Sequence, residues 1–404
     1  MSSPKTCWDS KNPNEQTLQN RCRESRWDTA VNFDLSEEQQ LLKDSVDRFV
    51  SDNYDLDTRQ KLSKNEAGFS DTYWQTMAEL GWLGVTIPEA HGGFGGTQAD
   101  TMVLMEAFGK GLVLEPFFAS AVLGTRAIVE GGSTELQTKL LPELMSGTCR
   151  LSLAYAEEQS RFDLEDVVTR ATANDNGYVI KGQKSMVQHG GSADYFVVSA
   201  RTSGGQRDEN GITLFLVDAQ NEGVSVDAFP TVDGQQAAEL RFDDVQVSAS
   251  DQLGNLDQGY SLLQDIAIDG ILALSAEAVG AMEILYKDTV AYTQEREQFD
   301  HRLADFQVLQ HRMVEMFMEY EQCKSMLYRA TLEVVQNGRG AMRIVHALKY
   351  MVGKIGTFIG ENAVQLHGGM GVTEELRIGH YFKRLLVIDA QFGNSDHHLA
   401  CFAG

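Results

Sequence analysis

The spacing of apolar residues changes twice along this chain, and the order of the changes restricts the folds open to it. Up to about residue 150, apolar side chains recur at helical spacing, as in Leu42, Val46 and Phe49. The next hundred residues form short strand-like runs, separated by turn signals such as Asn174-Asp-Asn-Gly177. Helical spacing then returns after Gly259 and continues to the end.

This order predicts a mainly α fold with a central β-domain. Strands without helical spacers between them indicate a small antiparallel sandwich or barrel. The long helices on its C-terminal side predict a four-helix bundle, in which Gly353, Gly356 and Gly360 fall near one helical face and permit close approach of a neighbouring helix. We predict a polar tail over 1–31, an N-terminal helical domain over 32–150, the β-domain over 151–255 and the C-terminal helical bundle over 256–404.

The chain is strongly acidic, with a formal net charge of −24 at pH 7. Such a charge argues against nucleic acid or an anionic membrane surface as the main partner. No run approaches the roughly 20 apolar residues that span a bilayer, and the polar N-terminus lacks the apolar core of a secretory signal, so we expect a cytoplasmic protein. The five cysteines show no CxxC spacing and no histidine cluster completes a zinc set, so we predict no metal site.

Two runs in the C-terminal segment combine residues that suit a dinucleotide. In the first, Arg296 and Phe299 precede Gln307, and in the second Gln365 precedes Gly368-Gly369. An arginine presents a planar fork of donors to a pyrophosphate, a phenylalanine offers a face for adenine, and a glutamine reads a polar edge. Paired glycines let the backbone come close to a phosphate or ribose. The alternative is that the arginine and phenylalanine only pack a helix-bundle dimer.

In these runs the chain resembles the acyl-CoA dehydrogenase family, which shows Arg-x-x-Phe-(x7)-Gln and Ala-Val-Gln-x-x-Gly-Gly-x-Gly at this separation. The resemblance spans about residues 33–404 and includes the loop that begins Ile87-Pro-Glu. It implies FAD as cofactor, an acyl-CoA thioester as substrate and electron-transfer flavoprotein as electron acceptor. It also implies an oligomer, because in this family the matching residues bind the FAD of the neighbouring subunit. Those residues are Arg296, Phe299, Gln307, Gln365 and Gly369.

The β-domain departs from the family pattern where the flavin ring and thioester would be held. In the usual run Thr-Glu-Pro-Gly-Ala-Gly-Ser-Asp, the Thr is here Ala156 and the Pro is Glu158. In a second run, Lys-x-Trp-Ile-Thr-Asn, the Trp is Met186 and the Thr is Gln188. Gln188 can still donate a hydrogen bond, and backbone amides do not depend on side chains. We therefore predict weakened cofactor contacts at Ala156 and Gln188.

The catalytic base is missing from both positions at which the family carries it. Desaturation needs a carboxylate to remove the α-proton while the flavin accepts a hydride from the β-carbon. An ungapped comparison places Phe392 at the usual Glu position and Gly270 at the alternative position on the first bundle helix. The catalytic residue is therefore unknown. Asp269 is a weak candidate, about 100° around the helix from Gly270, and Glu277 is a second whose simpler interpretation is an ion pair in the bundle core.

Further segments resemble the small subunit of pimeloyl-CoA dehydrogenase-type enzymes, in which two unlike chains assemble one catalytic site and whose relatives act on steroid or dicarboxylyl CoA thioesters. Three functions follow. The first is a subunit of an α2β2 heterotetramer whose partner supplies the Glu. The second is a self-sufficient homo-oligomeric dehydrogenase with an unusual base. The third is a non-catalytic structural or regulatory paralogue. The segments are residues 157–162, 230–235, 276–282, 306–311, 380–385 and 392–399.

Overall fold

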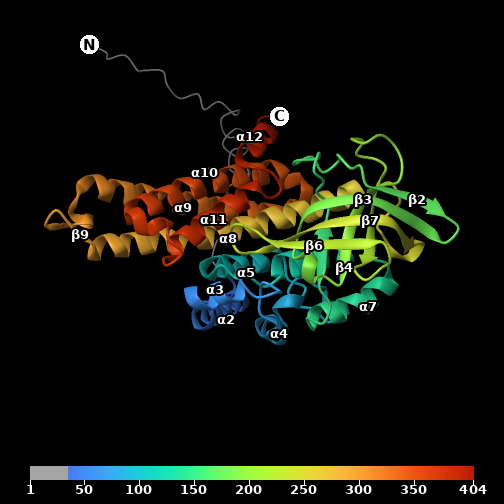
Figure 1. Ribbon diagram of the computed structural model, residues 1–404, viewed down its shortest axis with the longest axis horizontal. Coiled ribbons are helices and arrows are strands. Elements are labelled where there is room, and N and C mark those ends of the chain that lie inside the picture. The colour runs from blue at the N-terminus through green and yellow to red at the C-terminus, as the bar shows by residue number, and fades with distance from the viewer. Residues whose placement is uncertain (1–34) are drawn as a thin grey trace, which may run out of the picture. The chain divides into compact units, whose positions relative to one another are not determined.

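The computed structural model describes residues 35–404, so the tail predicted over 1–31 lies outside the described residues. All elements discussed below lie within Glu37–Gly404. Helices form both ends of this unit and one sheet lies between them in the sequence (Figure 1). The mainly α architecture with a central β-domain is therefore confirmed.

The N-terminal helices begin where side chains can cap them. Ser70 accepts a hydrogen bond from the backbone N–H of Tyr73, and Thr97 forms a capping box with Asp100. The helical segment from Phe117 to Gly131 begins as a π-helix whose eight residues are all buried, and only its second part is α-helical. A segment buried on every side has no polar face, so its winding cannot be read from apolar spacing. The helices are α2 Glu37–Asn53, α3 Leu56–Leu62, α4 Asp71–Glu79, η1 Trp82–Gly84, η2 Glu89–His91, α5 Gln98–Gly111, η3 Phe117–Gly124, α6 Thr125–Gly131 and α7 Thr134–Met145.

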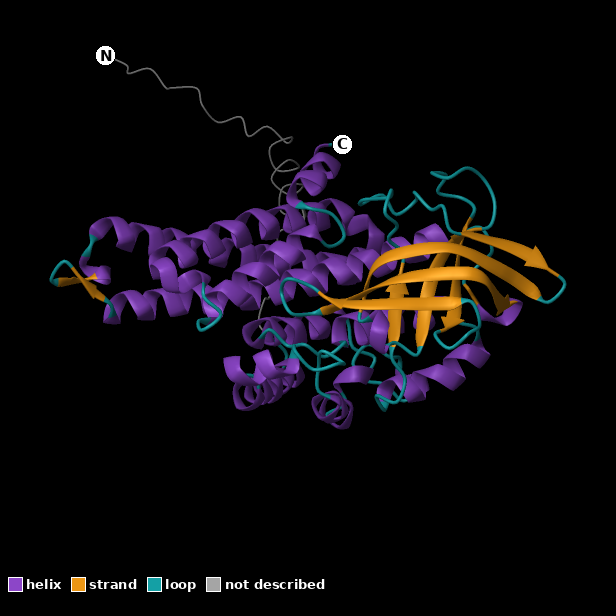
Figure 2. Ribbon diagram, viewed as in Figure 1, coloured by secondary structure: helices purple, strands orange, loops and turns teal. Residues whose placement is uncertain are grey.

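The β-domain is one eight-stranded sheet with the order β6-β7-β3-β2-β4-β5-β8, while β1 pairs with β4 (Figure 2). Most strand pairs are antiparallel, as predicted, but β1 runs parallel to β4 and β2 meets β4 through one parallel pair. A hairpin forces two consecutive strands to run antiparallel. β1 follows helix α7 and is not joined to β4 by a hairpin, so it can pair with β4 in the parallel direction. The strands are β1 Leu151–Ala154, β2 Arg170–Asn174, β3 Gly177–Gln188, β4 Tyr195–Arg201, β5 Ile212–Asp218, β6 Val224–Pro230, β7 Gln236–Ser248 and β8 Gln252–Leu253.

The C-terminal bundle is built on one 37-residue helix, α8, against which α5, α10, α9 and α11 all pack. A β-carbon on Gly109 of α5 would stand 1.9 Å from the Glu277 carbonyl oxygen, and one on Gly280 of α8 equally close to that of Glu106. The two helices therefore cross at these glycines. The bundle comprises α8 Gly259–Glu295, β9 Glu297–Gln298, β10 His301–Arg302, α9 Gln307–Asn337, α10 Met342–His367, η8 Gly368–Val372, α11 Arg377–Ala390 and α12 Ser395–Ala403.

The glycines predicted to let a neighbouring helix approach do lie beneath α11. A β-carbon on Gly353 would collide with the Asp389 carboxylate at 1.9 Å, and one on Gly360 with the Phe382 ring at 2.2 Å. At Gly356 the nearest atom is 3.4 Å away, so only two of the three positions require glycine for space. Over residues 35–404, no helix has the length and apolar character needed to cross a membrane.

Candidate functional site

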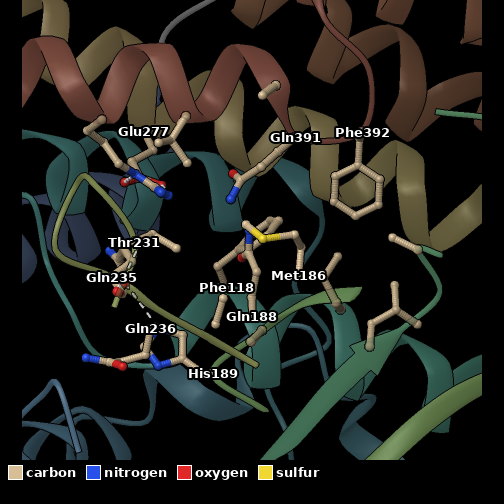
Figure 3. Close-up of a pocket in the computed structure, with 18 of the residues that line it drawn as sticks. Phe118, Met186, Gln188, His189, Thr231, Gln235, Gln236, Glu277, Gln391 and Phe392 are labelled. Carbon is tan, nitrogen blue, oxygen red and sulfur yellow. Dashed lines mark hydrogen bonds and ion pairs between the residues drawn. The ribbon is translucent and has the colours of Figure 1, made fainter. Parts of the chain in front are cut away.

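A cavity of about 590 Å³ lies where the sheet, α5, η3, α8 and the end of α11 meet. Its volume falls within the roughly 300–1,000 Å³ typical of small-molecule sites. Side chains from the sheet and from the end of α11 face each other across it, and Gln391 projects toward Met186 (Figure 3). Of the residues predicted to contact the cofactor from the β-domain, Ala156 and Gln188 both line this cavity.

Phe392 and Gly270, the two positions that we predicted to match the family's catalytic base, contact each other, and Phe392 lines this cavity. Phe392 follows α11 in a left-handed backbone conformation, with φ +54°. Its ring stands 3.1 Å from the point where a β-carbon on Gly270 would lie. The fold thus brings together two residues 122 positions apart in the sequence, and neither offers a carboxylate.

Aromatic rings cover this part of the wall. The Phe392 ring stacks on Tyr155 with centroids 5.0 Å apart and an interplanar angle of 6°. Phe118 meets Phe392 edge to face at 6.4 Å. Burial raises the pKa of the Tyr155 phenol above its usual value, so Tyr155 stays neutral at physiological pH. This wall is apolar and uncharged where a proton-abstracting group would be required.

The loop that carries Phe392 is held from behind by buried polar groups. Lys349 donates from Nζ to the carbonyls of Ile388, Asp389 and Gly393 at 2.8–2.9 Å. His398 Nε2 lies 2.9 Å from the Phe392 carbonyl, which can only accept, so this nitrogen carries the proton. Because of these bonds, the position of the Phe392 ring is set by α10 and α12 as well as by its own helix.

The charged side chains that line the cavity interior are paired with other protein groups. Arg384 binds both carboxylate oxygens of Glu277, at 2.6 and 2.7 Å, and reaches Asp233 at 2.8 Å. Although burial favours a neutral guanidine, these two carboxylates hold the pKa of Arg384 above its usual value. Glu277 is therefore engaged in the core ion pair that its simpler interpretation predicted.

Two further carboxylates at the cavity are also engaged. Glu157 accepts from Lys184 Nζ at 2.7 Å, and both groups are buried. Glu115 accepts from the Tyr54 hydroxyl and from the Ser70 backbone N–H. Burial raises the pKa of Glu115 to about 7, and the hydrogen bonds from Tyr54 and Ser70 offset only part of that effect. Neither group lies free beside Phe392 to act as a replacement base.

Asp269 lies in a different place from its neighbour Gly270. It lines a separate cavity of about 130 Å³ and accepts from Gln98 Nε2 at 3.0 Å, with Arg126 Nε 3.2 Å away. Burial raises the pKa of Asp269 to about 6, and Arg126 and Gln98 offset only part of that effect. Its carboxylate is not among the groups that line the larger cavity.

The residues predicted to bind the adenine end of FAD gather at the end of the bundle remote from the sheet, beside the β9–β10 hairpin (Figure 1). All five are exposed, and Phe299 at the hairpin tip is 84% exposed with φ +58°. Nothing lies within 4 Å of the β-carbon position of Gly368 or Gly369. The side chains of Arg296, Gln307 and Gln365 have no polar partner among residues 35–404. These exposed, unpaired groups fit the adenosine and pyrophosphate of an FAD.

A ring contact joins the two runs that carry these residues. Tyr292, one turn before Arg296, stacks on His367 at 4.3 Å, directly before Gly368. Segments about 70 residues apart in the sequence therefore present one surface.

Sequence reasoning missed several residues of the cavity. Gln391 and His189 line it, and each has a buried side-chain atom, Oε1 and Nδ1, without a hydrogen-bond partner. Arg384 and Tyr155 also line it. A buried aromatic residue or an arginine in a helix has no distinctive spacing in the sequence, so Tyr155 and Arg384 could not have been predicted. Gln391 could have been predicted only from its position next to Phe392. Within residues 35–404, no cluster of three His, Cys, Asp or Glu residues could hold a metal ion.

Three family models match the chain in succession. They are acyl-CoA dehydrogenase, N-terminal domain, over residues 36–148, the middle domain over 152–245, and the C-terminal domain over 258–403. The chain is 26% identical over 371 residues to a probable acyl-CoA dehydrogenase YngJ of Bacillus subtilis, which covers 91% of this chain and 97% of the relative. It is also 26% identical to the mitochondrial isovaleryl-CoA dehydrogenase of Pongo abelii, over 91% and 88% of the two chains.

Solved structures give the same result for the fold. A chain of the ChsE4-ChsE5 complex from Mycobacterium tuberculosis superposes with a TM-score of 0.84 at 25% identity, over 92% of this chain and 98% of that one. The Tcur3481-Tcur3483 steroid ACAD variant superposes with a TM-score of 0.82 at 27% identity, over 91% of this chain and 97% of that one. The FAD complex of PigA superposes with a TM-score of 0.85 at 26% identity, over 92% of this chain and 98% of that one.

Proposed function

The chain belongs to the acyl-CoA dehydrogenase family, and from that premise we propose that it is one subunit of a two-chain enzyme whose partner supplies the catalytic carboxylate. As a member of the family it is an oxidoreductase that acts on CH–CH groups, and its cofactor is FAD. FAD supplies the hydride acceptor for desaturation of the acyl thioester. The proposal concerns how the work is divided between two chains.

One contrast carries the proposal. The adenine-binding set is complete, exposed and unpaired at the end of the bundle, whereas the wall of this chain's own cavity places Phe392 against Gly270. A complete subunit would need both halves. The combination suits a chain that contributes Arg296, Phe299 and Gln365 to an FAD whose ring is held by its partner.

The roles of the individual residues follow from their chemistry. The guanidinium of Arg296 would neutralise pyrophosphate oxygens, and the exposed face of Phe299 would cover the adenine. Gln307 and Gln365 would donate to polar edges of the adenosine, and Gly369 would leave room for its ribose. Ala156 and Gln188 would act only if a flavin ring entered this chain's own cavity. Electron-transfer flavoprotein would then take electrons from the reduced cofactor.

Structural relatives support the two-chain arrangement and a class of substrate to test first. One similar structure is the ChsE4-ChsE5 complex, which contains two named chains. Another, Tcur3481-Tcur3483, carries a pair of chain names and is described as a steroid ACAD. Steroid side-chain CoA thioesters are therefore the first substrates to test, before dicarboxylyl and simple fatty acyl thioesters.

Co-expression tests the proposal. The chain is produced alone and together with a same-family chain encoded beside it, and each product is assayed for FAD absorbance and acyl-CoA oxidation. The pair should form a yellow complex that oxidises substrate, and the partner's catalytic Glu→Gln variant should lower kcat by about 10²–10⁴-fold. Normal turnover by the chain alone would exclude the proposal, and a colourless complex would favour a non-catalytic paralogue.

A homo-oligomeric enzyme that uses Asp269 as its base is the second candidate. The raised pKa of Asp269, about 6, is the observation in its favour, since a general base works best near the operating pH. Its placement in a separate cavity opposes it. If Asp269→Asn leaves the activity of the purified chain unchanged, this candidate is removed.

A further inference from the structure

The cavity of this chain is open although Phe392, which lines it, and Gly270, which lies against the Phe392 ring, offer no base. It keeps a volume of about 590 Å³, and its rings line the wall without filling the space. Around the entrance, three of the lining side chains are both apolar and exposed: Met186 at 53%, Val232 at 67% and Leu386 at 44%. An apolar molecule therefore meets an apolar entrance and an apolar interior.

The interior offers no free charge to a ligand. Arg384 is bound by two carboxylates, Lys184 neutralises Glu157, and Glu115 accepts from Tyr54 and Ser70. The charged lining residues that remain, Glu158 and Arg161, are exposed. An ionised group carried inside would lose its hydration without gaining a counter-ion, which is costly.

Hydrogen-bond acceptors inside the cavity lack donors. Gln235 Nε2 donates to the Val113 carbonyl, which turns its Oε1 toward His189 Nε2 at 3.1 Å. That nitrogen must therefore carry the proton, which leaves His189 Nδ1 as a buried acceptor to which no group within residues 35–404 donates. Gln391 Oε1 is likewise a buried acceptor with no donor among residues 35–404, and its side chain projects into the cavity (Figure 3). Buried acceptors of this kind cost free energy unless something donates to them.

From the apolar entrance, the paired charges and these two acceptors, we propose that the cavity is a binding-only site for an uncharged apolar molecule that carries a hydroxyl group. The hydroxyl donates to Gln391 Oε1, and the apolar body lies against Phe392, Tyr155 and Phe118. No bond is made or broken, because no base lies beside the ligand. The site is distinct from the shared FAD site of the proposed function.

Three ligands that share a ten-carbon chain separate the effect of a hydroxyl donor from the effect of charge. The full-length chain is titrated calorimetrically with 1-decanol, methyl decanoate and decanoate. We expect 1-decanol to bind about three- to tenfold more tightly than methyl decanoate, which has no donor. Decanoate should bind at least about tenfold more weakly than 1-decanol, because its charge meets no unpaired cation among the described residues of the cavity interior. If decanoate binds as tightly as 1-decanol, or if no ligand binds, the proposal is wrong.

Variants locate the site. Gln391→Leu should abolish the preference for 1-decanol over methyl decanoate, and Gln391→Met provides a second variant if the first does not fold. Gln322→Leu, at an exposed glutamine of α9, is the matched control and should leave all three affinities unchanged. An unchanged preference in both Gln391 variants would overturn the assignment.

FAD itself is the competing occupant, because its ring also carries an N–H donor. The titration with 1-decanol is therefore repeated with saturating FAD. Unchanged affinity supports the binding-only site, whereas one-for-one displacement would identify the cavity as a flavin site and overturn it. Turnover by the two-chain complex tests the proposed function independently, so either idea can fail without the other.

Discussion

At the scale of single residues, the cavity wall is organised around Arg384. Its guanidinium forms an ion pair with Glu277 and also binds Asp233, whose own backbone carbonyl accepts from Arg59 at 2.6 Å. The cluster joins α8, α11, α3 and the loop before β7. Its value lies in mutual compensation, since each buried charge would be costly alone.

We predict that Arg384→Leu lowers the free energy of unfolding by about 3–5 kcal/mol, because it leaves two buried carboxylates without their cation. Chemical denaturation at pH 7 measures this loss. Adding Glu277→Gln to the variant should recover part of it, because one uncompensated charge is then gone. If Arg384→Leu alone is as stable as the wild type, water must hydrate the two carboxylates in place of the guanidinium.

The buried His398 makes stability depend on pH. Burial, with Lys349 nearby, lowers the pKa of His398 to about 3, against about 6.5 in an unfolded chain. Between these values the unfolded chain binds the proton and the folded chain does not. Stability is therefore complete above pH 6.5 and falls as the pH drops toward 3.

We predict that His398→Gln removes a contribution on the order of 3–5 kcal/mol to this acid destabilisation. Denaturation curves between pH 7 and 4 should be flatter for the variant than for the wild type. His311→Gln, at an exposed histidine of α9, serves as the control and should keep the wild-type slope. Parallel curves for all three proteins would show that His398 is not responsible.

At the scale of elements, the spacing of helices depends on which glycines touch backbone. At the crossing of α5 and α8, a β-carbon on Gly280 would lie 1.9 Å from a carbonyl oxygen, which cannot move without its helix. On α10, a β-carbon on Gly356 would meet the flexible ends of Leu385 and Met282 at 3.4 Å. Both are helix glycines with opposite surroundings.

We predict that Gly280→Ala lowers the midpoint of thermal unfolding and costs at least about 1–3 kcal/mol, because the two helices must separate. Gly356→Ala is the matched control and should gain up to about 1 kcal/mol from its higher helix propensity. Both are measured by thermal unfolding followed by circular dichroism. Equal shifts in both variants would show that the helix crossing is not tight at Gly280.

At the scale of the whole molecule, the residues predicted to bind adenine and the residues at the predicted base positions lie at opposite ends of the bundle. The residues predicted to bind adenine lie in or beside β9, α9 and η8, and Figure 1 shows β9 at the end of the bundle remote from the sheet. Phe392, in contrast, lines the cavity that the sheet helps to form. Exposed residues that bind another molecule contribute little to the chain's own stability, so their loss should show in cofactor binding alone.

We predict that Arg296→Gln and Phe299→Ala each lower the FAD content of the two-chain complex while leaving the thermal unfolding of the isolated chain within about 1 °C, because both side chains are exposed. The ratio of flavin to protein absorbance after gel filtration measures the loss. Val335→Ala, on exposed α9 surface, is the control. Full FAD content in both variants would argue against a role for this surface.

The sequence by itself determined the order of helices, sheet and helices, because apolar periodicity depends on which faces are buried. It also predicted a set that would bind the adenine end of FAD, from two runs that each have a fixed internal spacing, and that assignment stays a prediction. It could not give the parallel pairing of β1, the π-helix in η3, or the placement of Asp269 in a cavity separate from the one that Phe392 lines. Adjacent helical residues face different neighbours, and only packing decides which.

The tertiary structure alone decided how the empty base positions relate. Phe392 and Gly270 are far apart in the sequence, and no pattern in either segment announces that one ring fills the space above the other residue. The same holds for Arg384, whose two carboxylate partners come from different segments. Contacts between distant segments depend on the register of several helices at once, and that register is fixed only when the whole core is packed.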